Sequence, residues 1–221
     1  MSMRLAETTA QAHGTAARVT VDPQYFERQY QRAPDPWQLE SRWYDQRKYA
    51  VSTALLTRRQ YRAGFEPGCS VGVLSQALAA RCDRLLCWDL AEAAVKAAKE
   101  RLHDLPHVQV EHRAIPLDWP TGSFDLIVFS EILYYLGDTD LRQTLDLALP
   151  ALEPDGTLLA VHWRHPVPDH ARDGDDVHQA LADQAGLLSA VRYCEPDFVA
   201  EVFIRTNDSV LPSVAQATGL V

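Results

Sequence analysis

Short apolar segments alternate with amphipathic segments through the middle of the chain. Segments at residues 61–65, 85–88, 107–112, 124–129 and 157–161 have the length of strands, and those at 85–88, 124–129 and 157–161 are mostly apolar. Helical spacing of apolar residues follows from Val73 onward, at residues 91–102 and at residues 141–152. Such regular alternation of strand and helix predicts a parallel sheet with helices on both faces.

The ends of the chain follow other patterns. Residues 187–193 and 198–204 flank the turn Cys194-Glu195-Pro196-Asp197 and predict an antiparallel hairpin, preceded by a helix near residues 177–185. Upstream, a helix over residues 46–60 would place Tyr49, Thr53 and Leu56 on one face. Residues 1–20 and 207–221 lack periodicity, so we expect a disordered leader, one domain over residues 21–206, and a loose tail.

Length, composition and charge narrow the class of protein. A chain of 221 residues with 47% apolar residues fits one α/β domain. No apolar run approaches the roughly 18 residues of a membrane span, and residues 1–16 lack the apolar core of a signal peptide. We therefore expect a cytoplasmic protein that does not bind membranes. A formal charge of −9 argues against a nucleic-acid partner.

The four cysteines and the histidines give no metal motif. Cys69, Cys82, Cys87 and Cys194 form neither a C-x-x-C pair nor a zinc spacing, which predicts reduced thiols. His162, His165 and His170 lie in one loop with Asp169, but their spacing matches no ligand motif. We expect no metal at this site.

The stretch YRAGFEPGCSVGV, residues 61–73, carries the first candidate site. Pro67 disfavours helix at the preceding residue, so Glu66 should stay extended at the strand end with its carboxylate pointing out of the sheet. Gly68 and Gly72 leave the following turn without side chains at two points, so a ligand can approach the backbone near Cys69 and Ser70. The alternative is a strand-turn-helix crossing without a ligand.

The absence of two phosphate-binding motifs narrows the class of ligand. The dinucleotide fingerprint G-x-G-x-x-G would require glycine where Ser70 and Val73 stand, and the Gly-Lys-Ser/Thr ending of a phosphate-binding loop is absent. A pyrophosphate ligand is therefore disfavoured. The pattern E-x-G-x-x-x-G suits a ligand with a positive charge and a ribose, which is the chemistry of S-adenosylmethionine.

Asp89 extends this interpretation. It ends the apolar run LLCW at about the distance from a glycine turn where ribose-binding carboxylates occur, and Leu90 follows it. We expect Asp89 to bind both ribose hydroxyls. Alternatively, Asp89 is the N-cap of the helix that follows.

These residues resemble a known family. Residues 64–72, Asp89 and the run FDLIVFSEILYYL resemble three strand ends of class I S-adenosylmethionine-dependent methyltransferases, and DPWQLESRWYDQRKY resembles the segment before the first strand of nodulation-type (NodS-like) N-methyltransferases. The resemblance covers about residues 24–205. It implies one Rossmann-like domain with seven strands in the order 3-2-1-4-5-7-6, the last antiparallel, and an N-terminal helical lid. Ser70 departs from the glycine of many members, but it is small enough for the same close approach.

The resemblance also implies which residues contact the cofactor. Residues 25–49 are dense in aromatic rings and arginines, and we select Trp37 and Arg42 as contacts to the adenine and the methionyl carboxylate. An amphipathic helix that covers the sheet edge is the alternative. Backbone groups of Ala114 and Ile115 would contact the adenine, because the usual acidic residue is absent there. Ser130 ends the fourth strand beside the cofactor.

Glu131 is the leading catalytic candidate. It follows the strongest strand, and a helix beyond it should bring Tyr135 and Tyr134 to the same edge of the sheet. His162 and His165 should face them from the neighbouring strand end. Alternatively, Glu131 is a carboxylate that stabilises a helix N-terminus.

The resulting hypothesis is a methyltransferase. We expect it to use S-adenosyl-L-methionine, to release S-adenosyl-L-homocysteine, and to methylate an amine on a small polar acceptor such as an amino sugar or an oligosaccharide-like molecule. The alternatives are an O- or C-methyltransferase of a secondary metabolite and a nucleoside-binding regulatory module without turnover. The expected assembly is a monomer or a homodimer.

Overall fold

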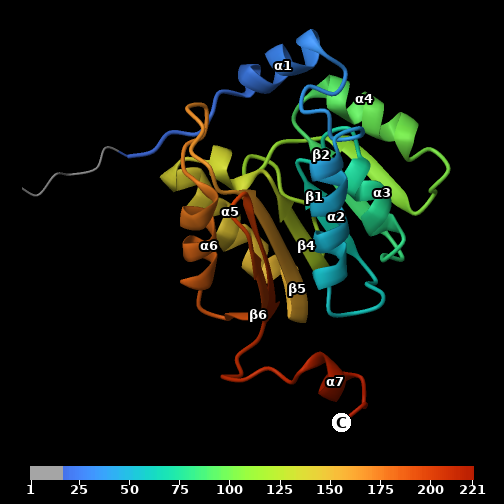
Figure 1. Ribbon diagram of the computed structural model, residues 1–221, viewed down its shortest axis with the longest axis vertical. Coiled ribbons are helices and arrows are strands. Elements are labelled where there is room, and N and C mark those ends of the chain that lie inside the picture. Colours follow the sequence, from blue (N-terminus) through green and yellow to red (C-terminus); the bar gives the residue numbers. More distant parts are fainter. Residues whose placement is uncertain (1–16) are drawn as a thin grey trace, which may run out of the picture.

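The computed structural model describes residues 17–221, which contain one seven-stranded sheet (Figure 1). The strand order β3-β2-β1-β4-β5-β7-β6 is the one predicted. Strands β1 to β5 run parallel, and β7 runs antiparallel to both of its neighbours. The strands are β1 (Gly64–Pro67), β2 (Leu85–Asp89), β3 (Val108–His112), β4 (Phe124–Ser130), β5 (Leu152–Trp163), β6 (Leu187–Cys194) and β7 (Phe198–Arg205).

Helices cover both faces of the sheet, as the strand-helix alternation predicted (Figure 1). The described residues form α1 (Pro23–Arg32), α2 (Trp43–Leu55), α3 (Val73–Ala79), α4 (Glu92–Arg101), α5 (Asp138–Ala151), α6 (Gly174–Ala182), α7 (Val214–Ala217) and the 3-10 turn η1 (Leu133–Tyr135). Side chains of α2, α3 and α4 pack into one hydrophobic cluster with the sheet, and those of α5 and α6 into a second. Residues 124–129 of β4 are all buried between the two clusters, which explains why every residue of this segment except Asp125 is apolar.

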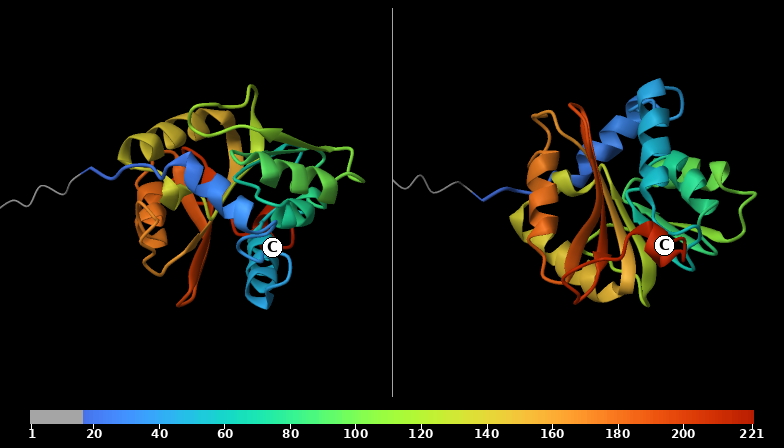
Figure 2. Two further views of the ribbon diagram at one scale, coloured as in Figure 1. Left: turned by 90° about the horizontal axis from the view of Figure 1, so that it is seen from above. Right: turned by 60° about the horizontal axis from the view of Figure 1, so that its bottom comes forward.

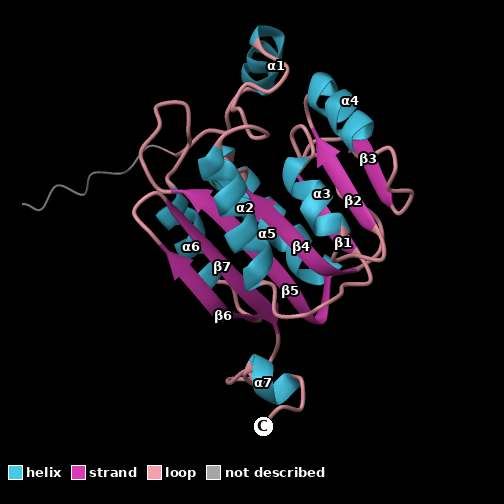
Figure 3. Cartoon of the chain, turned by 45° about the vertical axis from the view of Figure 1, so that its right-hand side comes forward, coloured by secondary structure: helices cyan, strands magenta, loops and turns pink. Residues whose placement is uncertain are grey.

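The first helix lies apart from these two layers. Figure 3 shows α1 beyond the carboxyl ends of the parallel strands, and the view from above in Figure 2 shows it crossing that end of the molecule. Ligands of open α/β sheets bind at this end. The fold therefore places a helical cover over the expected site.

Two predicted boundaries around β1 and β4 are wrong. The first strand begins at Gly64 instead of Tyr61, because the Asp125 carboxylate accepts the backbone N–H groups of Arg62 and Ala63 at 2.9 and 2.8 Å and withholds them from strand pairing. After β4 the chain forms only the short turn η1 where a helix was predicted. Glu131 has a φ of 56°, which interrupts helical geometry just before Tyr134 and Tyr135.

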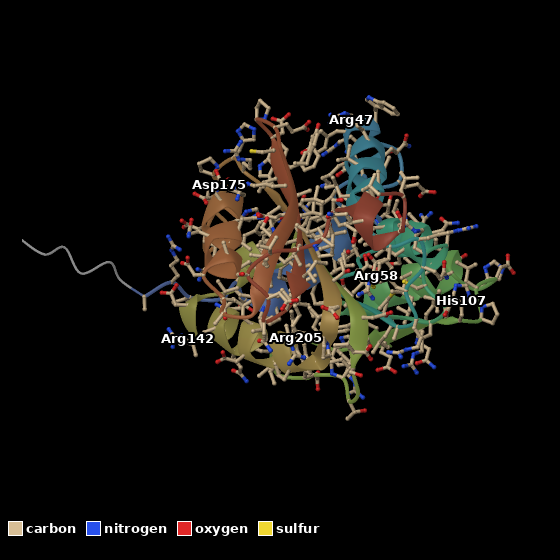
Figure 4. All side chains as sticks on the ribbon, turned by 90° about the horizontal axis from the view of Figure 1, so that it is seen from below. Arg47, Arg58, His107, Arg142, Asp175 and Arg205 are labelled. Atoms are coloured by element: carbon tan, nitrogen blue, oxygen red, sulfur yellow. The ribbon has the colours of Figure 1, made fainter. Side chains whose placement is uncertain are left out.

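The buried face of α2 also differs from the prediction. Its buried side chains are Asp45, Lys48, Tyr49 and Ser52, whereas Thr53 is only partly buried and Leu56 lies just past the helix end. On its outer side, Arg47 (labelled in Figure 4) pairs with Glu195 at 2.8 Å, and this pair ties α2 to the turn between β6 and β7. Charged and polar groups thus replace the apolar stripe that helix prediction relies on.

The ends of the chain are more structured than predicted. Residues 1–16 of the predicted leader lie outside the described residues, but the next few contact the domain: Arg18 N donates to the Asp138 carboxylate at 3.0 Å, and Val21 N donates to Tyr135 O at 2.9 Å. The tail contains α7, whose N-terminus is closed by a capping box of Ser213 and Gln216. Within residues 17–221, no helix is both long and apolar enough to span a bilayer.

Candidate active site

A cavity of 770 Å³ lies at the carboxyl ends of the strands. This volume is within the roughly 300–1,000 Å³ of typical ligand sites. We call its two parts the glycine-turn half and the aromatic half. The glycine-turn half is lined by Tyr30, Trp37, Arg42, Glu66, Gly68, Cys69, Ser70, Asp89, Leu90, Ala114 and Ile115, and the aromatic half by Tyr25, Phe26, Tyr44, Asp45, Lys48, Ser130, Glu131, Tyr134, Tyr135, Trp163 and His170.

The turn after β1 has the conformation that its glycines predicted. Gly68 has a φ of 75°, and a side chain there would meet the Ile132 side chain at 2.7 Å. Ser70 also has a positive φ, of 50°. Gly72 does not line the cavity: a Cβ atom there would lie 3.2 Å from Ala98 of α4, so its role is the close packing of α3 on α4. Its assignment as a ligand contact is therefore corrected.

Asp89 both shapes the turn and faces the cavity. One carboxylate oxygen accepts the Ser70 N–H at 2.8 Å, and the other accepts the Ala91 N–H at 2.9 Å next to the start of α4. The N-cap of α4 is Ala91, so the alternative of Asp89 as the helix cap is wrong. Each Asp89 oxygen keeps a lone pair that a ligand can use. Burial raises the pKa of Asp89 to about 6, despite these two hydrogen bonds.

Glu66 is buried, whereas the sequence predicted a carboxylate that points out of the sheet. It is only 2% exposed, it lines the cavity, and the Cys87 thiol lies 3.6 Å from its Oε2. Burial raises its pKa to about 7. A carboxyl group in such surroundings favours a positively charged ligand that restores its ionised form.

Helix α1 and the loop after it cover the glycine turn. Tyr30 OH lies 2.5 Å from Ser70 Oγ, and the Trp37 ring packs edge-on against Tyr30 at 5.5 Å. Arg42 is exposed at the rim, and among the described residues its side chain has no ion-pair partner. The backbone of Ala114 is less available than expected: its N–H donates to the Asp118 carboxylate at 3.2 Å, and its C=O accepts the Asp118 N–H at 2.8 Å.

Glu131 is the centre of the aromatic half. Its Oε1 accepts from the Lys48 ammonium at 2.7 Å, and its Oε2 accepts from Tyr134 OH at 2.7 Å and from the Trp163 N–H at 3.0 Å. Three donors therefore hold the carboxylate in one orientation and leave it one of its roughly four lone-pair positions. Tyr135 lies beside Tyr134, with ring centres 4.7 Å apart.

Lys48 and Asp45 are site residues that the sequence did not indicate. The Lys48 side chain is 5% exposed, and its Nζ lies 3.0 Å from Asp45 Oδ1 as well as 2.7 Å from Glu131. Burial lowers the pKa of Lys48, but the Glu131 and Asp45 charges outweigh this effect, and the pKa is raised. The group is thus an ion triad with one net negative charge, which joins α2 to the end of β4.

The two histidines selected as catalytic do not line the cavity. His162 is fully buried behind Tyr134, where its Nδ1 lies 3.2 Å from His178 Nε2, and burial holds its pKa well below the usual value. His165 is exposed and lies 2.7 Å from Asp197. The histidine that does reach the cavity is His170, which stacks on Tyr134 with ring centres 4.0 Å apart. Burial lowers the pKa of His170, which keeps the ring neutral near pH 7.

Comparison with known proteins identifies relatives with this architecture. The family model of nodulation protein S (NodS) matches residues 21–175. Curated relatives include Nodulation protein S of Rhizobium tropici, 30% identical over 129 residues, and that of Bradyrhizobium diazoefficiens, 32% identical over 127 residues. These matches cover 58% and 57% of this chain but only 54% and 61% of the relatives, so the chain spans little more than half of their length.

Two solved structures extend the comparison. A putative methyltransferase from Pseudomonas syringae is 46% identical, with a TM-score of 0.66, and the match covers 74% of this chain and all of the other. The N-methyltransferase NodS from Bradyrhizobium japonicum WM9, solved with S-adenosyl-L-homocysteine, is 27% identical, with a TM-score of 0.75 over 82% of this chain and 97% of the other. Because the family model matches most of the chain and its solved members share the seven-stranded fold, this chain belongs to the nodulation protein S (NodS) family.

Proposed function

We propose that this chain is an S-adenosylmethionine-dependent methyltransferase that methylates an amine on a small polar acceptor, such as an amino sugar or an oligosaccharide-like molecule. The observation that carries the proposal is one cavity that joins the glycine-turn half to the Glu131–Lys48–Asp45 triad. The related NodS from Bradyrhizobium japonicum WM9 is an N-methyltransferase that binds S-adenosyl-L-homocysteine. Both lines of support favour the same cofactor.

The residues of the glycine-turn half fit this cofactor. Asp89 has lone pairs for the ribose hydroxyls, the Trp37 ring can cover the base, and Arg42 at the rim can pair with the methionyl carboxylate. Glu66 lies on the same side of the cavity, where a positively charged ligand would favour its ionised form. When bound, the cofactor supplies an electrophilic methyl group on a sulfonium.

The aromatic half fits an amine better than a hydroxyl. An amine nitrogen gains positive charge as it accepts a methyl group, and the triad offers one net negative charge at the cavity wall. A hydroxyl must lose a proton, whereas the Glu131 carboxylate is already occupied by three donors. In this proposal Glu131 and Tyr135 position the nitrogen, and neutral His170, which lines the same half of the cavity, can take up a proton.

Two measurements test the proposal. Calorimetry should detect binding of S-adenosyl-L-homocysteine and no comparable binding of NAD. Incubation with S-adenosylmethionine and a panel of amino sugars, phenols and carboxylic acids should give a methylated product, detected by mass, only with amines. Cofactor binding without any product would favour a regulatory module, and methylation of phenols alone would contradict the choice of acceptor.

Asp89→Ala should weaken S-adenosyl-L-homocysteine binding by about 1.5 to 3 kcal/mol, because charge-assisted hydrogen bonds to the ribose are lost. Calorimetry at pH 8 measures this difference. For the native protein the affinity should fall as the pH drops below about 6, where the unliganded Asp89 carboxylate becomes protonated. Asp89→Asn keeps an acceptor oxygen and should lose less affinity than Asp89→Ala. An unchanged dissociation constant in Asp89→Ala would restrict Asp89 to shaping the turn.

Residues 25–49 should close over the cofactor. Tyr30 already contacts Ser70 of the glycine turn, and Trp37 packs against Tyr30. A bound ligand adds contacts that hold both side chains in place. Backbone hydrogen exchange of the segment should slow when S-adenosyl-L-homocysteine is added, while exchange in α5 stays the same. Equal exchange of residues 25–49 with and without the ligand would mean that they only pack against the sheet.

A further inference from the structure

Aromatic rings surround the Glu131 end of the cavity on two sides. On one side, the Phe26 ring packs on Tyr135 at 4.8 Å and Tyr135 packs on Tyr134 at 4.7 Å. On the other side, the Tyr44 ring packs edge-on against Trp163 at 5.6 Å. All five rings line the cavity.

Glu131 joins these two groups of rings. One of its oxygens accepts both the hydroxyl of Tyr134 from the first group and the backbone N–H of Trp163 from the second. The carboxylate is therefore held between the two groups by hydrogen bonds that cross the end of the sheet. A molecule that enters this space meets the rings, the oriented Glu131 carboxylate and the Lys48 ammonium, which lies 5.4 Å from the centre of the Tyr44 ring.

The cavity wall around Glu131 carries a net negative charge, as a cation-binding site requires. The triad of Asp45, Lys48 and Glu131 carries two negative charges and one positive charge, and the Asp45 and Lys48 side chains are each 5% exposed. The whole cavity is lined by five carboxylates, of Asp45, Glu66, Asp89, Glu131 and Asp140, against three cations, of Arg42, Lys48 and Arg113. Quaternary ammonium groups bind proteins in sites of this composition, made of rings with nearby negative charge.

We propose that the aromatic half is a cage for a methylated ammonium, so that the site admits nitrogens that already carry methyl groups as well as primary amines. This deepens the proposed function and rests on it for the link to catalysis, but the cage itself is testable by binding alone. A site for a neutral amine would need only hydrogen-bond partners. The nitrogen that attacks is the neutral amine with its lone pair. As the N–C bond forms and the C–S bond of the sulfonium breaks, the nitrogen becomes a methylated ammonium, and the rings and the net negative charge match this cation, which has few or no N–H groups left to donate.

Choline and 3,3-dimethyl-1-butanol are matched probes, because they have the same shape and hydroxyl group and differ in a cationic nitrogen versus a neutral carbon. Each is titrated into the full chain saturated with S-adenosyl-L-homocysteine. Choline should bind at least about tenfold more tightly than the neutral alcohol, which is the scale of a desolvated cation–π contact with added charge attraction.

Variants of Tyr44 and Glu131 test whether these side chains cause the preference for choline over the neutral alcohol. The Tyr44 hydroxyl has no hydrogen-bond partner among the described residues, so Tyr44→Phe should keep the preference for choline, whereas Tyr44→Leu should reduce it several-fold. Glu131→Gln should also reduce the preference and leave binding of the neutral alcohol unchanged. Glu153→Gln is the control, because this carboxylate pairs with Arg62 away from the cavity.

The possible results separate the two proposals. Equal affinities for choline and the neutral alcohol, or no choline binding by a protein that still binds S-adenosyl-L-homocysteine, would overturn the cage. A preference for choline that survives both Tyr44→Leu and Glu131→Gln would also overturn it. Failure to bind S-adenosyl-L-homocysteine would instead contradict the proposed function, whatever choline does.

Discussion

Lys48→Met should lower the free energy of unfolding by about 3 to 5 kcal/mol, the usual cost of breaking a buried ion pair by removing one partner. The substitution keeps the length of the side chain but leaves the carboxylates of Asp45 and Glu131 without their shared cation. Because the pKa of Lys48 is raised in the folded protein, its stabilising effect is complete below the unfolded pKa of about 10.4 and is lost only as the pH rises through the higher folded value. Urea unfolding at pH 7.5 measures the difference.

The chain offers a matched control and a rescue for this prediction. Lys99 is an exposed lysine of α4, and Lys99→Met should change stability by no more than about 0.5 kcal/mol. Adding Glu131→Gln to Lys48→Met should restore part of the lost stability, because it removes one of the two unpaired charges. If Lys48→Met were as stable as the native protein, the triad would not contribute to holding α2 on the sheet.

Glu131→Gln should lower kcat by roughly 10² or more, the range for a group that transfers or orients a proton. The glutamine oxygen can still accept a hydrogen bond from the Lys48 ammonium, but the substitution removes the negative charge that favours a cationic nitrogen. The affinity for S-adenosyl-L-homocysteine should stay nearly unchanged, because Glu131 forms hydrogen bonds with Lys48, Tyr134 and Trp163 and none with the glycine turn. Steady-state kinetics with the amine identified in the acceptor panel, together with calorimetry, measure both quantities.

Two further results would change the assignment of Glu131. Full turnover by Glu131→Gln would exclude it as the group that positions the amine, and His170 would be the next residue to replace. Chelation by EDTA should leave the activity intact. Activity that disappears in EDTA and returns with magnesium would instead favour a metal-assisted O-methyltransferase.

The sheet and the cofactor-side residues follow from local sequence patterns. The mostly apolar segment of residues 124–129 predicts a buried strand, and the structure has β4 at that place. The glycine turn and Asp89 are each encoded within a few residues of a strand end, and parallel strands bring such ends to one edge of the sheet. Composition, periodicity and spacing were sufficient there because each feature depends on near neighbours.

The predictions that failed depend on partners far away in the sequence. His162 was expected to face the acceptor, but its Nδ1 faces His178 of α6, which packs behind the sheet. Gly72 has the glycine of a ligand-binding turn, yet its contact is Ala98 of α4. A position at a strand end shows that a residue lies at the edge of the sheet. Whether its side chain faces the cavity or a neighbouring helix depends on how the helices pack.

The sequence by itself determined the alternation of strands and helices, the glycine turn and the carboxylates at the ends of β1, β2 and β4, and the family resemblance supplied the order of the strands. Only the tertiary structure decided the acceptor side of the cavity, where Lys48 of α2 meets Glu131 across 83 residues of chain. The α2 sequence has no clear apolar face, and a charged residue in it is expected at the surface. Lys48 is buried because the fold brings two carboxylates to it, and no local pattern records an interaction between segments that meet only after folding.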